Sequence, residues 1–235
     1  MRLVSRRIFL CLAGGAFAAP QFSWAANEVP TLLDHILLGC SDLDRGIGFV
    51  EERTGVRAAF GGVHPGRGTQ NALLSLGTRR YLEIIAPDPK QSGVQQYPVI
   101  TELTEPRLIG WAAHPGDLQS FAAKLAKSGV AAAGPTPGSR KRPDGRVLQW
   151  KALTLKENAA DLLPFFIEWS ADSIHPSADS PKGCSLLRFE ASSPNPEALS
   201  KHVALLGLDI PVVKSETPQL RATIAGPKTQ FTVTS

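Results

Sequence analysis

The chain has 235 residues, 43% of them hydrophobic and 20% charged, which is enough to bury one medium-sized core or two small ones. Its 25 basic and 21 acidic residues give a formal charge of +4, but Arg2, Arg6 and Arg7 stand at the very N-terminus. Without these three arginines, 22 basic residues face 21 acidic ones, a net charge of +1. This balance gives no argument for a nucleic-acid partner or for binding to a membrane surface.

The first 25 residues have the features of an export signal. Arg6 and Arg7 precede a moderately apolar run from Ile8 to Phe17, which is typical of the twin-arginine route. The run is shorter than the ~20 apolar residues that a transmembrane helix needs, and Ser23-Trp24-Ala25 offers a small-x-small cleavage site. We therefore predict a periplasmic or secreted protein without stable membrane insertion after cleavage. An uncleaved N-terminal anchor is the alternative.

After the signal, the chain repeats a unit of one strand, one helix and three further strands (βαβββ). The first copy begins with an apolar strand, 33–39, and a helix from about Asp42 to Arg53 whose apolar residues recur on one face. Gly55 is suited to end this helix, because glycine readily adopts the left-handed conformation of a helix C-terminus. The three strands expected to follow are 56–60, 71–76 and 81–86.

The second copy begins with a strand at 108–113 and a helix from Asp117 to Lys127. Asp42-Leu43 recurs here as Asp117-Leu118, a shift of 75 residues, and such regular self-similarity indicates a repeat architecture. The prolines, glycines and arginines of residues 134–146 predict a long loop. The strands expected around this loop are 130–133, 147–154 and 163–169.

The third copy has a strand at 186–191 and a helix from Pro196 to Leu206, with Asn195 as a favourable N-cap. Its expected strands are 210–213, 220–225 and 231–234. The fold class predicted from these elements is α+β. The predicted segments are an export signal at 1–25, βαβββ modules at 26–105 and 106–180, and a C-terminal half-module at 181–235 with a structural or dimer-forming role.

Two glutamates and one histidine interrupt strands that are otherwise apolar. Glu83 and Glu168 lie in the last strands of the first and second copies, and His35 lies in the first strand of the first copy. Burying an ionised carboxylate without a partner is costly, so a proton, a cation or a metal should accompany each glutamate. Each residue alone could be a hydrogen-bonded core group or an edge-strand charge. Together, their repeat-related positions favour metal binding or acid–base chemistry.

Several short motifs accompany these three residues. They are Leu33-Asp34-His35, Asp42-Leu43, the loop and strand 64–73, the strand 81–86, the segment 139–145, the strand 164–169 and His175-Pro176. With them the mature chain resembles the vicinal oxygen chelate superfamily, and within it the glyoxalase-like domain group. The resemblance implies a cupped mixed sheet built from βαβββ modules, of the glyoxalase/bleomycin-resistance/dioxygenase type.

In that superfamily the metal ligands come from the first and last strands of each module. Mapped onto this chain, the four positions are His35, Glu83, Gly110 and Glu168, so the glycine breaks the set. The resemblance therefore implies one divalent ion (Mn, Fe, Zn or Ni) held by the other three residues, with an open position for substrate. It also implies that one of the two glutamates acts as a general base.

The activity implied is that of a lyase, an isomerase or a dioxygenase acting on a small substrate with neighbouring oxygen atoms. A metal-free protein that binds or sequesters a small molecule in the same cup is the alternative from another functional class. The pairing of Cys40 with Cys184 is left open by the sequence, as is a homodimer. The further residues predicted to contact the substrate are His64, Thr69, Asn71, Arg140, Arg142 and Trp169.

Overall fold

The structure is a computed structural model that describes residues 28–94 and 97–235, so the predicted export signal lies outside the described residues. The first part of the fold consists of β1 (Leu33–Gly39), α1 (Leu43–Thr54), β2 (Ala59–His64), β3 (Thr69–Ser75) and β4 (Tyr81–Pro87). The second consists of the 3-10 helix η1 (Pro98–Glu102), β5 (Arg107–Ala113), α2 (Leu118–Lys127), β6 (Ala132–Lys141), β7 (Val147–Leu155) and β8 (Phe165–Trp169). The third consists of α3 (Pro176–Asp179), β9 (Ser185–Ser193), α4 (Pro196–Leu205), β10 (Val212–Lys214), β11 (Gln219–Ala225) and β12 (Gln230–Thr234).

Local capping explains where the helices begin and end. The side chain of Asp42 accepts a hydrogen bond from the Arg45 amide at the start of α1, and Gly55 ends the helix with a φ of 79°. Asn195 caps α4 by accepting from the Ala198 amide, as the sequence predicts. Among the described residues, no helix is long and apolar enough to cross a membrane.

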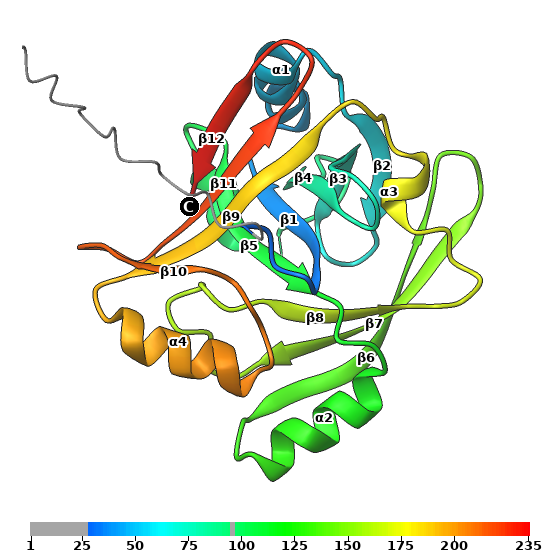
Figure 1. The fold of residues 1–235 in the computed structure, drawn as a ribbon. Helices are drawn as coiled ribbons and strands as arrows, with labels where there is room; N and C mark the ends of the chain where they lie inside the picture. Colours follow the sequence, from blue (N-terminus) through cyan, green and yellow to red (C-terminus); the bar gives the residue numbers. More distant parts are fainter. Residues whose placement is uncertain (1–27, 95–96) are drawn as a thin grey trace, which may run out of the picture.

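The first eight strands form one mixed sheet in the order β2-β3-β4-β1-β5-β8-β7-β6 (Figure 1). The first strands of the two modules, β1 and β5, pair antiparallel at the centre of the sheet. Each also pairs in parallel with the last strand of its own module, β1 with β4 and β5 with β8. The two modules therefore occupy the two halves of one sheet. This arrangement confirms the predicted α+β fold with a mixed sheet.

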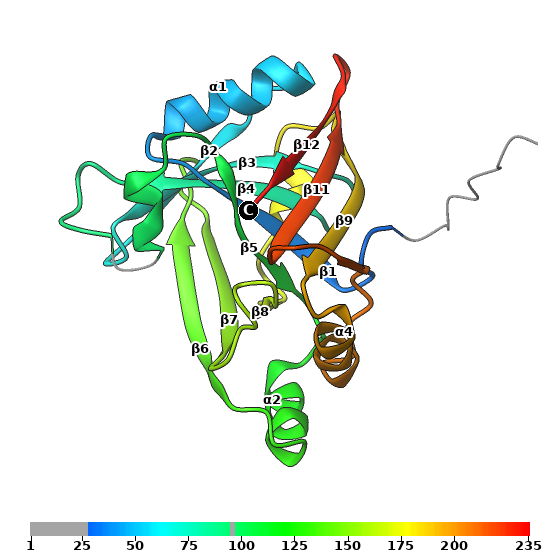
Figure 2. The same cartoon turned by 90° about the vertical axis from the view of Figure 1, so that its left-hand side faces the viewer.

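The sheet curls so strongly that its two edge strands, β2 and β6, come into contact (Figure 2). A Cβ atom at Gly62 of β2 would lie 2.8 Å from the carbonyl oxygen of Lys141 in β6. Along β1, side chains alternate between the two faces. His35 and Leu37 line the cavity on the concave face, whereas Ile36 belongs to the hydrophobic core. The cup that the resemblance implies is therefore present.

The segment predicted as a long loop, 134–146, is largely strand. β6 runs through Pro135 and Pro137 to Lys141 and pairs with β7 at Ala132 and Ala133 and again from Thr136 to Lys141, with a register shift between the two stretches. Prolines are tolerated here because β6 is an edge strand, where the outer backbone groups need no sheet partner. The prediction of a loop from proline and glycine content was therefore wrong for residues 134–141.

The C-terminal segment repeats the element order of the modules but not their strand order. Its strands form a separate sheet in the order β10-β9-β11-β12, so the strand after the helix pairs directly with β9. This sheet packs on the outer face of the large one, with the rings of Trp111 and Phe189 5.4 Å apart between centroids (Figure 1). Cys40 and Cys184 are both buried free thiols, so the disulfide left open by the sequence does not form.

Candidate functional site

The concave face of the large sheet holds a cavity of about 660 Å³. A cavity of this size suits a small organic molecule. Its polar side is formed by residues from five strands: His35, His64, Asn71, Glu83 and Arg140. Its apolar side is formed mainly by Tyr81, Trp150, Phe165, Ile167 and Trp169.

Glu83 is the buried carboxylate at the centre of the polar side. Asn71 Nδ2 donates to its Oε1 at 2.6 Å, and the Nε2 atoms of His35 and His64 lie 3.5 and 3.6 Å from its two oxygens. Burial by itself raises the pKa of this carboxyl, but the two histidines, the amide and Arg140 outweigh burial and bring the pKa below its usual value. Glu83 is therefore an ionised carboxylate at neutral pH, able to accept a proton.

The orientation of the Asn71 amide is fixed by its two neighbours. Its Oδ1 accepts from Arg140 Nη1 at 3.1 Å, and its Nδ2 donates to Glu83. A guanidinium can only donate and a carboxylate can only accept, so the reverse orientation would lose both hydrogen bonds. Asn71 therefore separates the positive group from the negative one while bonding to each.

His64 is held as a neutral imidazole. Its Nε2 lies 3.3 Å from Asn71 Nδ2, an amide donor, so Nε2 accepts. Its Nδ1 lies 2.9 Å from the hydroxyl of Thr69, to which it donates. Burial lowers the pKa of His64 to about 4. Thr69 is fully buried and acts on the cavity only by orienting this histidine.

We expect His64 to make the protein less stable in mild acid. Because the folded pKa of about 4 lies below the reference value of 6.5, only the unfolded chain gains a proton as the pH falls through this window. The free energy of unfolding should drop by about 3 kcal/mol between pH 7 and 4 on this account. Urea unfolding of wild type and His64→Asn at several pH values measures the difference.

The matched control for that experiment is His202→Asn, which changes an exposed histidine. It should keep the acid sensitivity of the wild type, whereas His64→Asn should lose about 3 kcal/mol of it. Equal pH dependence in all three proteins would show that His64 is not held neutral.

His35 is oriented by Asp34, the residue before it. Asp34 is the extra residue of a β-bulge in β1, and its Oδ1 accepts from His35 Nδ1 at 2.7 Å. The imidazole also stacks on the ring of Tyr81, with 4.5 Å between centroids. Because Nδ1 is bonded to Asp34, the other ring nitrogen, Nε2, faces Glu83.

Asp34 accepts two further hydrogen bonds at its other oxygen. Trp169 Nε1 and His175 Nε2 both lie 3.1 Å from Oδ2. Burial raises the pKa of this carboxyl, but the hydrogen bonds and charges of His175 and His35 bring it far below the usual value. Asp34 thus fixes a histidine and a tryptophan of the cavity wall, a role that the sequence did not reveal.

Glu168 does not reach the cavity. It lies between Ile167 and Trp169, which both line the cup, so its side chain points to the other face of the sheet. There it accepts from the Leu118 amide at the start of α2 at 2.8 Å and from Lys151 Nζ at 3.0 Å. The structure therefore separates Glu168 from His35 and Glu83.

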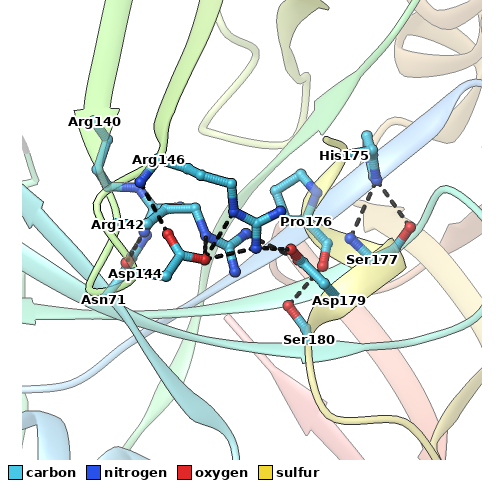
Figure 3. A network of polar contacts seen from close by, with 10 residues as sticks. All are labelled: Asn71, Arg140, Arg142, Asp144, Arg146, His175, Pro176, Ser177, Asp179 and Ser180. Atoms are coloured by element: carbon cyan, nitrogen blue, oxygen red, sulfur yellow. Dashed lines mark hydrogen bonds and ion pairs between the residues drawn. The ribbon is translucent and has the colours of Figure 1, made fainter. Parts of the chain in front are cut away.

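The two predicted arginines also have different surroundings. Arg140 lines the cavity, whereas Arg142 lies outside it and pairs with Asp179 at 2.9 Å and with Asp144 at 3.4 Å (Figure 3). Arg146 joins the same network. Arg142 thus ties the β6–β7 hairpin to α3 and does not contact the cup.

The donor set predicted for a metal is not assembled. His35 and Glu83 face each other, but Glu168 is on the opposite face and Gly110 offers no side chain. Among the described residues, no three His, Cys, Asp or Glu side chains are placed so as to hold a metal ion. The predicted three-ligand set thus does not fit, and we derive no chemical step through a metal.

Comparisons with known proteins agree with this architecture. A family model described as a glyoxalase-like domain matches residues 33–207. The solved structure of a hypothetical protein from Staphylococcus aureus has a TM-score of 0.61 and 20% identity, covering 85% of this chain and 84% of that one. Methylmalonyl-CoA epimerase from Mycobacterium tuberculosis has a TM-score of 0.45 and 20% identity, covering 62% of this chain and 92% of that one. A comparison with curated protein sequences finds no match.

Proposed function

Since the chain belongs to the glyoxalase-like domain family, we propose that it is a small-molecule isomerase or lyase that works by proton transfer. Glu83 accepts a proton from a carbon atom beside a carbonyl group, and the electrons of the C–H bond pass into an enolate. When the first carbon carries a hydroxyl group, return of the proton to the former carbonyl carbon, with transfer of the hydroxyl proton to the other oxygen, completes an isomerisation in which no oxidant or reductant is consumed. The observation that carries this proposal is a buried, ionised carboxylate on the wall of a ligand-sized cavity.

His35 has the second role in this scheme. In an α-hydroxy carbonyl compound, the hydroxyl proton must move from one oxygen to its neighbour while the carbon proton moves between the carbons. The Nε2 atom of His35, 3.5 Å from Glu83 Oε2, is close enough to serve the same substrate. Asp34 behind the ring keeps this nitrogen turned toward the cavity.

The experiment is proton exchange in heavy water. The mature protein is incubated with a panel of α-hydroxy carbonyl compounds, and the loss of C–H signals is followed by proton NMR. We expect at least one compound to exchange faster than in buffer alone. The assay is run on protein treated with a chelator and on protein reloaded with Mn²⁺, Fe²⁺, Zn²⁺ or Ni²⁺, so that the predicted metal dependence is tested in the same samples.

A metal-free sequestering protein is the second candidate. The tilted rings of Trp150 and Trp169, 5.6 Å apart between centroids, favour it because they give the cavity an aromatic wall suited to binding alone. Ligands that bind tightly without any exchange, in either metal state, would support this candidate and contradict the proposed enzyme.

Export by the twin-arginine route is likewise our proposal, and fractionation of cells expressing the full chain tests it.

A further inference from the structure

Among residues 28–94 and 97–235, Arg140 is a buried cation without an anionic partner. Arg140 is only 4% exposed, yet no carboxylate oxygen lies within 4 Å of its guanidinium nitrogens in the described part of the chain. The one hydrogen bond of the guanidinium within those ranges goes to Asn71 Oδ1, although a guanidinium carries five N–H donors. Burying a charge that is not paired is costly, so the remaining donors should meet an anion supplied from the cavity that Arg140 lines.

The edge strand β2 leaves space for this guanidinium. Gly61 is the extra residue of a β-bulge, and a Cβ atom there would lie 2.6 Å from Arg140 Nη1 and 2.5 Å from Asn71 Oδ1. At Gly62, which has a φ of 135°, a Cβ atom would lie 3.3 Å from Arg140 Nη1. Any side chain at Gly61 would displace the arginine or the amide, so the glycines form a cradle for this pair.

The neighbouring arginine of the same hairpin provides the contrast. Arg142 is neutralised within the chain by Asp144 and Asp179, as Figure 3 shows. Within the described ranges, the chain thus supplies carboxylates for Arg142 and none for Arg140. Glu83 does not take this role, because Asn71 stands between the two groups and bonds to both.

An aromatic wall adjoins the guanidinium. The ring of Trp150 lies over Gly138, where a Cβ atom would come within 2.6 Å of it, and Gly138 is two residues before Arg140 on the same face of β6. Trp169 continues this wall from β8. A ligand with an anionic end at Arg140 would therefore place its body against the two indoles.

We propose that Arg140 binds the carboxylate of an aromatic carboxylic acid whose ring lies against Trp150 and Trp169. This inference rests on the proposed function for the role of Glu83, because it names the class of substrate that the same cup takes. The carboxylate would occupy the Arg140 end, and the carbon that exchanges its proton would lie toward Glu83. Planar, bidentate contact is the geometry in which a guanidinium discriminates carboxylates best.

The test measures binding rather than turnover. Isothermal titration calorimetry compares 3-phenyllactate with its primary amide, which has nearly the same shape but no charge. We expect wild type to prefer the acid by at least about tenfold. In Arg140→Gln the acid and the amide should bind equally weakly. An acid-to-amide ratio near one in wild type, or an unchanged ratio in Arg140→Gln, would overturn the proposal.

Two further variants separate ligand binding from a structural role, because Arg140 also joins β6 to β3. Arg140→Lys keeps the charge but loses the planar fork, so its ratio should fall between those of wild type and Arg140→Gln. Arg142→Gln removes a charge from the same hairpin and should keep the full ratio. If melting temperature falls in the Arg140 variants while the ratio stays constant, Arg140 is only a structural link and the proposal fails.

The failure of this inference can be told from that of the proposed function. Acid-selective binding without proton exchange in any compound would leave the Arg140 site intact and reject the enzyme. Proton exchange with neutral compounds, together with an acid-to-amide binding ratio near one, would support the enzyme and reject the Arg140 site. Glu83→Gln removes a negative charge from the cavity and should bind the acid at least as tightly as wild type does.

Discussion

Replacing Glu83 by glutamine should lower proton exchange by about 10²- to 10⁴-fold, the range that a positioned general base contributes. The amide cannot accept a carbon proton, but it has the shape of the carboxylate and can still accept from Asn71 Nδ2. His35 and His64 should keep their places, since Asp34 and Thr69 hold them from behind. Initial exchange rates in heavy water, measured for wild type and Glu83→Gln on the same compound, give the ratio.

Glu168→Gln is the matched control. It makes the same chemical change at the position that the sequence treats as equivalent, but on the opposite face of the sheet. We expect exchange within about twofold of wild type, with a small loss of stability from the weaker N-terminal contact to α2. An equal loss of exchange in both variants would mean that both carboxylates act on the substrate, contrary to their placement here.

The repeat indicated the βαβββ modules, and the resemblance to a known superfamily implied that the modules form a cup. The structure has two such units in one sheet, with the first and last strands of each unit at its centre, as the resemblance implies. Because His35 and Glu83 stand in those strands, the sequence could place them together, and their side chains do meet at 3.5 Å. Their chemical roles, by contrast, stay predictions.

Side-chain direction within a strand was the part that could not be predicted. Alternation identifies the inner face only where one face is polar, and the strands around Glu83 and Glu168 are apolar on both. The register of β7 with β8, which pairs Lys151 with Glu168, shows the true direction of that side chain. A shift of one residue moves every side chain of a strand to the other face, so equal position in two repeats was not enough.

Arg140 was predicted to contact the substrate, but its position in a strand and the role of Asp34 were hidden, for different reasons. Arg140 stands among prolines and glycines that are typical of a loop, and only the pairing of β6 with β7 shows that it lies in a strand. Asp34 precedes a histidine in the same strand, and alternation would send their side chains to opposite faces. The β-bulge at Asp34 breaks that rule and lets the two bond.

Replacing Asp34 by asparagine should destabilise the protein by about 3 kcal/mol. The reason is that a buried carboxylate, which accepts hydrogen bonds from two imidazoles and one indole, becomes a neutral amide. The depressed pKa of Asp34 sets the sign of the pH dependence. Its stabilisation is complete above the ordinary carboxyl pKa of 3.8 and is lost as the pH falls below it, so the variant should approach wild type in strong acid. Urea unfolding at pH 7 and below pH 3 measures both values.

Asp117→Asn is the control for stability, since asparagine is also a good N-cap and the unfolding midpoint should stay near that of wild type.

If Asp34 positions His35, its replacement should also change proton exchange, an effect that a loss of stability alone does not predict. The amide of Asn at position 34 can donate to His35 Nδ1, which would transfer the ring proton to Nε2 and point it at Glu83. We therefore expect proton exchange in folded Asp34→Asn to fall at least about 10²-fold with a changed pH profile. A fully folded variant with the exchange rate and pH profile of wild type would show that Asp34 stabilises the wall of the cup without orienting its histidine.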